Sequence, residues 1–74
     1  MLRYKLTEKG LNKLHGFVLE HGSEDHIAEY VTEAESIASH AFRVDMPALL
    51  TIESYTEGYE VYLSLERDWF EVEA

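Results

Sequence analysis

Histidine offers the widest choice of chemistry in this sequence, which holds four: His15, His21, His26 and His40. Neutral imidazole binds metals and titrates near neutral pH, so clustered histidines can form a metal site or a pH-sensitive one. His21 and His26 flank a short segment, with Asp25 beside His26. Their spacing matches no zinc signature, and a catalytic zinc needs three protein ligands and an open fourth position. We therefore expect solvated histidines and no bound metal or other cofactor.

Catalysis by a nucleophile finds little support in the residue types. The sequence has no cysteine, no glycine-flanked serine of the nucleophile-elbow type and no glycine-rich loop of the kind that holds phosphate. Carboxylates are plentiful, but acids on helix and strand faces are normally solvated. A chain of 74 residues also has little material to enclose a pocket of the roughly 300 Å³ at which small-molecule sites begin. We predict that the protein is not an enzyme.

Acidic side chains are the dominant chemical feature. Six basic and fifteen acidic residues give a net charge of −9. Residues 1–13 hold four cations and one acid, a balance of +3, whereas residues 14–74 hold two cations and fourteen acids, a balance of −12. Such a surface repels nucleic acid and anionic lipid and attracts basic protein surfaces. The charge therefore indicates a basic protein as the partner.

One group of acids recurs with helical spacing. Asp25, Glu29 and Glu33 stand at positions i, i+4 and i+8, which places them in one stripe with steps of roughly 6 Å. Like charges at this spacing destabilise a helix by a few tenths of a kcal/mol per pair. No lysine or arginine lies within residues 14–42 to relieve them. The regular step resembles the repeat of phosphates along one DNA strand.

A second group of acids follows the strand periodicity of the C-terminal half. Glu53, Glu60, Glu66, Glu71 and Glu73 are expected to share the outer face of a sheet with Thr51, Tyr62, Ser64 and Trp69. Tyrosine and tryptophan are favoured anchors in protein interfaces. The two groups together supply the candidate contacts with a protein partner: Asp25, Glu29, Glu33, Glu60, Tyr62, Glu66, Glu71 and Glu73.

Two amphipathic helices must position the first group. Thr7 is a suitable N-cap for a helix over residues 8–21, and Gly22 suits the position just after its end. Ser23 is expected to cap a second helix over residues 24–42, whose apolar residues form one uninterrupted stripe. A capping-box pattern at 32–35 leaves an alternative open. In that alternative, residues 26–31 form a strand and the helix begins only at Glu33.

Four strands complete the layout. Residues 2–6 alternate apolar and charged side chains, and residues 48–54, 59–66 and 69–73 also alternate between a predominantly apolar face and a more polar one. Turns at 55–58 and at Arg67-Asp68 separate the last three strands, which predicts an antiparallel meander. Tyr59 and Val72 are expected to point inward. The predicted fold is α+β, with the order β-α-α-β-β-β and both helices on one face of a small antiparallel sheet.

Length and composition indicate one domain over residues 1–74. The absence of cysteine is typical of a reducing compartment such as the cytoplasm. No apolar run approaches the roughly 18 residues of a membrane span, and the N-terminus lacks the apolar segment of a signal peptide. We expect a cytoplasmic protein that does not bind membranes.

In size, acidity, lack of cysteine and α+β layout, the chain resembles small phage-encoded inhibitors of the anti-CRISPR and DNA-mimic types. These types share no motif, so the resemblance implies a style of action and no individual residue. It implies a protein in the host cytoplasm that occludes the basic, nucleic-acid-binding surface of a target such as a CRISPR effector. The alternative is a homo-oligomeric structural or regulatory module, for example a homodimer, because self-association adds buried area to a small domain.

Direct binding of nucleic acid is not expected. Arg3, Lys5, Lys9 and Lys13 form the only basic cluster in the sequence. Four cations fall short of the roughly six to ten phosphate contacts that specific DNA-binding proteins make. The acidic remainder repels a duplex, so we expect no measurable affinity for DNA or RNA at physiological salt.

Overall fold

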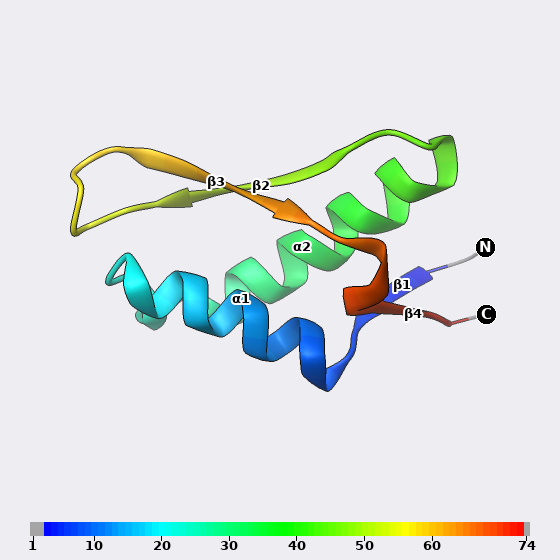
Figure 1. Ribbon diagram of the computed structural model, residues 1–74, viewed down its shortest axis with the longest axis horizontal. Helices are drawn as coiled ribbons and strands as arrows, with labels where there is room; N and C mark the ends of the chain where they lie inside the picture. The colour runs from blue at the N-terminus through cyan, green and yellow to red at the C-terminus, as the bar shows by residue number, and fades with distance from the viewer. Residues whose placement is uncertain (1–2, 74) are drawn as a thin grey trace.

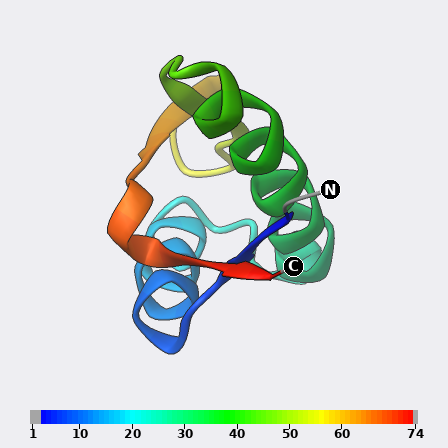
Figure 2. The ribbon, with the colours of Figure 1, turned by 90° about the vertical axis from the view of Figure 1, so that its right-hand side faces the viewer.

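The first and last strands lie side by side in the computed structural model, which describes residues 3–73 (Figures 1 and 2). Strand β1 (Arg3–Leu6) pairs antiparallel with β4 (Phe70–Glu73). The register places Arg3 opposite Glu73 and Lys5 opposite Glu71. Each basic side chain of β1 therefore has an acidic cross-strand neighbour.

The middle strands form a separate ribbon. Strand β2 (Ala48–Glu53) pairs antiparallel with β3 (Glu60–Leu65), and the two lie along α2 in Figure 1. The α+β class and the β-α-α-β-β-β order are confirmed. The single sheet is not: among residues 3–73 the strands form two sheets of two strands each. The acids of β4 consequently do not share a sheet face with those of β2 and β3.

A single turn of 3₁₀ helix, η3 (Arg67–Trp69), causes this division. The Trp69 N–H donates to the Glu66 carbonyl at 3.0 Å, and the Trp69 carbonyl accepts from the Thr7 N–H at 2.9 Å. The chain is thereby directed from β3 towards β1 instead of reversing into a hairpin. The extra turn also changes the alternation: Trp69 is 7% exposed and belongs to the core, while Val72 is exposed. Tyr59, also expected to point inward, is exposed as well.

Helix α1 (Glu8–Glu20) begins at the predicted residue and ends one residue before the predicted end. The Thr7 side chain accepts a hydrogen bond from the Gly10 N–H at 3.2 Å. At the other end Gly22 has φ of 71°, the left-handed conformation that glycine adopts without strain. The helix therefore ends at a glycine because the chain must turn sharply there.

The second helical segment is continuous, although its ends are tighter turns. A 3₁₀ turn η1 (Glu24–His26) leads into α2 (Ile27–Ala41), and a second, η2 (Phe42–Val44), follows it. The strand alternative for residues 26–31 is wrong. The expected cap is also wrong: Ser23 makes no side-chain cap hydrogen bond. Its hydroxyl is buried and donates instead to the Val18 carbonyl at 3.4 Å.

The core lies between the two helices and the β2–β3 ribbon. The buried residues of α2 are alanines, namely Ala34, Ala38 and Ala41, and larger side chains of this helix are only partly buried against the core. Small side chains let this helix approach the strands closely. Larger side chains arrive from the facing elements, among them the fully buried Leu14 and Leu50. The α2 face is thus held against β1 and β2 at once.

Side chains of α2 also satisfy the outer edge of β1. Ser39 Oγ accepts from the Tyr4 N–H at 2.9 Å, and Glu35 Oε2 accepts from the Leu6 N–H at 2.9 Å. A strand edge carries unpaired backbone groups that would otherwise invite another strand. Along β1 that edge is covered by α2.

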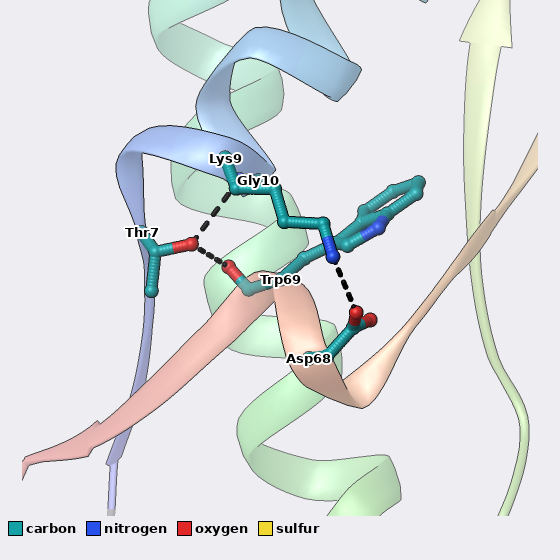
Figure 3. A network of polar contacts seen from close by, with 5 residues as sticks. All are labelled: Thr7, Lys9, Gly10, Asp68 and Trp69. Atoms are coloured by element: carbon teal, nitrogen blue, oxygen red, sulfur yellow. Dashed lines mark hydrogen bonds and ion pairs between the residues drawn. The ribbon is translucent and has the colours of Figure 1, made fainter.

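Figure 3 shows how η3 is tied to the start of α1. The Thr7 hydroxyl donates to the Trp69 carbonyl at 3.0 Å, and Lys9 Nζ lies 2.6 Å from Asp68 Oδ2. The hydrogen bond from Lys9 lowers the pKa of Asp68, and the same bond raises the pKa of Lys9. Both side chains are more than half exposed, so salt screens the pair.

This pair predicts opposite pH limits. The lowered pKa of Asp68 means that its stabilisation exists above the ordinary aspartate pKa and is lost as pH falls through the folded value. The raised pKa of Lys9 means that its stabilisation exists below the ordinary lysine pKa and is lost as pH rises through the folded value. In an NMR titration, Lys9→Gln should raise the Asp68 midpoint, whereas Lys5→Gln should leave it in place. An unchanged midpoint in Lys9→Gln would refute the pairing.

Candidate protein-binding surface

His21 fastens the turn between the helices to the turn of the β2–β3 hairpin. Its Nδ1 lies 2.9 Å from Ser54 Oγ, and its carbonyl accepts from the Tyr55 N–H at 2.9 Å. The ring packs against Phe17 with centroids 4.6 Å apart. His21 is only 9% exposed, so the expectation of a solvated histidine is wrong here. Ser54 is 1% exposed, so its contact with His21 lies in the interior of the molecule.

Three further aromatic rings, those of His26, Tyr30 and Tyr55, also connect the helices to the β2–β3 hairpin. His26 Nε2 lies 3.2 Å from the Tyr55 hydroxyl, and the Tyr30 hydroxyl accepts from the Glu53 N–H at 3.2 Å. Desolvation raises the pKa of Tyr55, and so do, in decreasing order, Glu53, Tyr30 and Asp25. Acids from the helical turn and from the hairpin therefore converge on one place.

These contacts define an acidic end of the molecule. Segments 20–33 and 53–60 hold eight acids and no lysine or arginine, a balance of −8. All other residues hold seven acids and six cations, a balance of −1. The two turns lie together at one end in Figure 1, opposite the two chain termini. The acids of this end are all exposed: Glu20, Glu24, Asp25, Glu29, Glu33, Glu53, Glu57 and Glu60. Almost the whole net charge is thus concentrated there.

The predicted contact residues divide between the two ends. Asp25, Glu29, Glu33 and Glu60 belong to the acidic end, and Tyr62 is 65% exposed on β3 nearby. Three others do not join them. Glu66, Glu71 and Glu73 lie near the β1–β4 ribbon, where Glu71 and Glu73 stand opposite basic residues of β1.

A groove between α2 and β2 adjoins the acidic end and shares acids with it. It has a volume of about 460 Å³, and Glu33, Glu53 and Glu60 are its charged lining residues. No lysine or arginine lines it. Glu53 was absent from the predicted contacts, although its place opposite Glu60 follows from the hairpin register. The alternation of residues 48–54 was the signal that identifies it.

The Glu53 and Glu60 pair predicts a stability gain on charge reversal. The two face each other across β2 and β3, and like charges directly opposite in a sheet are destabilising. Glu60→Lys should therefore stabilise the fold by about 0.5 kcal/mol. Glu71→Lys changes the charge equally but places lysine opposite Lys5, so it should destabilise by a similar amount. Urea unfolding of both variants tests this, and equal shifts would contradict it.

The described part of the chain has neither a cluster of metal ligands nor a membrane-spanning helix. Within residues 3–73 no three histidine or acidic side chains are grouped so that they could hold a metal ion. No helix in that same range is long and apolar enough to cross a bilayer.

Comparisons with known proteins add no relative to this picture. No protein-family model matches the chain, and searches of curated proteins and of solved structures found no match to it.

Proposed function

We propose that the protein is a non-enzymatic inhibitor that binds a basic, nucleic-acid-binding protein and occludes its nucleic-acid surface. A CRISPR effector is the class of target that the resemblance to small phage-encoded inhibitors implies. The observation that carries the proposal is the concentration of charge: eight exposed acids and no lysine or arginine in segments 20–33 and 53–60.

Physical considerations support this use of the acidic end. Concentrated negative charge steers a basic partner into encounter and selects its orientation. The charges cost stability, as the Glu53 and Glu60 pair does. Exposed tyrosines stand beside them, Tyr55 and Tyr62 among them, and tyrosine supplies contact area at low entropic cost. The acidic end therefore combines steering with anchors.

Affinity capture from host lysate tests the proposal with two matched variants. The triple substitution Glu29→Gln, Glu33→Gln and Glu60→Gln removes three charges from the acidic end. A second triple, Glu66→Gln, Glu71→Gln and Glu73→Gln, removes three from the opposite end. The wild type should capture a basic protein that duplex DNA or RNA displaces. The first triple should lose it, and the second should retain it.

Salt and inhibition complete the test. Capture should weaken as salt rises, because the acidic end acts through charge. The purified partner should bind its nucleic acid less tightly when the wild-type protein is added. A partner that is not basic, or capture unaffected by both salt and the first triple, would overturn the proposal. Direct binding of duplex DNA by the isolated protein in the micromolar range would overturn it too.

A further inference from the structure

The free edge of β2 exposes backbone groups that point into the groove. The Ser54 N–H donates across the hairpin to the Tyr59 carbonyl, whereas the Glu53 N–H points away from β3 and donates to the Tyr30 hydroxyl. Backbone groups of successive residues in a strand point to opposite edges. By this alternation the N–H and C=O groups of Leu49 and Thr51 also face away from β3.

Side chains of α2 form more hydrogen bonds with the outer edge of β1 than with the free edge of β2. Along β1 its Ser39 and Glu35 side chains accept from both outward N–H groups. Along β2 it covers only the N–H of Glu53, through Tyr30. Within residues 3–73 no side chain bonds to the backbone of Leu49 or Thr51. This stretch of edge is therefore ready to pair with an added strand.

The groove beside this edge is long enough to receive an extended segment. The acidic hollow adjoins a second one of about 460 Å³, and the two share Ser36, Ile37 and Leu49. The second hollow is lined mainly by apolar residues, including Met46 and Pro47. Leu49 and Met46 are both more than half exposed. One continuous groove thus changes from apolar to acidic along β2.

We propose that the partner of this protein inserts an extended basic segment into the groove as a third strand beside β2. The inference rests on the proposed function for its basic partner, and it adds the mode of docking. Backbone pairing covers Leu49 and Thr51 and ends where Tyr30 closes the edge. An apolar side chain of the segment lies by Leu49, and a lysine or arginine reaches Glu53.

The spacing within the segment follows from strand geometry. Leu49 and Glu53 are four residues apart, which is about 13 Å along a strand, and their side chains share one face. Antiparallel pairing is the more stable arrangement. The segment therefore carries its basic residue four positions before its apolar one, with a β-branched residue midway opposite Thr51.

A designed peptide serves as the probe: acetyl-Thr-Lys-Thr-Val-Thr-Leu-Thr-amide with a fluorescent label. Fluorescence anisotropy should show saturable binding with a Kd below about 1 mM. The amides of Leu49 and Thr51 should gain protection from hydrogen exchange in NMR. Two control peptides probe the two features separately. Replacing the lysine by glutamate should abolish binding through charge, and N-methylating the valine should weaken it at least about tenfold through the lost backbone donor.

Protein variants give the reciprocal test. Thr51→Pro removes the free-edge N–H without touching the ladder to β3, since proline is tolerated where the N–H faces outward. It should weaken binding about tenfold. Thr51→Val keeps the N–H and the β-branched shape and should bind within about threefold of wild type. Thermal unfolding verifies that both variants fold. The N-methylated peptide decides the question on the wild-type protein if Thr51→Pro does not.

Several outcomes would overturn the docking mode. Equal binding of the N-methylated peptide excludes strand pairing, and perturbations confined to β3 place the segment elsewhere. A concentration-dependent dimer that Thr51→Pro abolishes would identify a second copy of the chain as the occupant. If Thr51→Pro still captures the basic partner from lysate with wild-type yield, the proposed function stands and the docking mode fails. The same conclusion follows if the triple Glu29→Gln, Glu33→Gln and Glu60→Gln loses capture while Thr51→Pro keeps it.

Discussion

Gly10→Ala is expected to lower the free energy of unfolding by about 3 kcal/mol, a large share of the total for so small a domain. A Cβ at Gly10 would lie 2.7 Å from Leu6 Cδ2 and closer still to the Trp69 carbonyl oxygen. That oxygen accepts from both the N–H and the hydroxyl of Thr7, so it cannot retreat without breaking the N-cap region. The clash involves backbone, which has no rotamer to change.

Gly16→Ala is the matched control on the same helix. Nothing lies within 4 Å of a Cβ at Gly16. Alanine is favoured over glycine inside a helix, so this variant should be more stable than wild type by roughly 0.5–1 kcal/mol. Urea unfolding followed by the fluorescence of the single tryptophan measures both. If the two variants shift in the same direction, the close approach of α1 and η3 is wrong.

Trp69→Ala should destabilise the protein by about 3–5 kcal/mol, the usual cost of removing a buried aromatic side chain. Trp69 is 7% exposed and belongs to the core cluster. Tyr62→Ala is the control, because Tyr62 is 65% exposed and was predicted to share a face with Trp69. It should cost less than about 1 kcal/mol.

Thermal unfolding followed by far-UV circular dichroism tests this pair, since Trp69→Ala removes the fluorescent probe. Each kcal/mol shifts the midpoint by roughly 4–8 °C in a domain of this size. We therefore expect a fall of more than about 12 °C for Trp69→Ala. Similar midpoints for Trp69→Ala and Tyr62→Ala would restore the outward tryptophan and the three-stranded meander.

Local patterns in the sequence predicted the elements well. Alternation located β2 and β3, the apolar stripe located α2, and Thr7 and Gly22 marked the ends of α1. These features act over a few residues, since an N-cap or a left-handed glycine depends on neighbouring backbone. Glu29 and Glu33 lie one turn apart on α2, as their spacing predicts, whereas Asp25 lies in the preceding turn η1.

Long-range features were not predictable from these patterns. Periodicity states which side chains share a face of one strand, but it does not state which strand pairs with which. Arg67–Trp69 has turn composition in either case, yet its 3₁₀ turn buries Trp69 and sends β4 to β1. The burial of His21 likewise depends on Ser54, 33 residues away.

The charge shows the division most clearly. The sequence by itself determined the amount of negative charge, the helical elements and the strands that carry it. Only the tertiary structure decided where the charge gathers. The β1–β4 register places Glu71 and Glu73 opposite Lys5 and Arg3. The contacts of His21 with the β2–β3 turn bring Glu53 and Glu60 close to the acids of the helices. The reason is that strand pairing and the burial of Trp69 and His21 depend on contacts between residues far apart in the sequence. Local alternation only decides on which face of a strand a side chain lies.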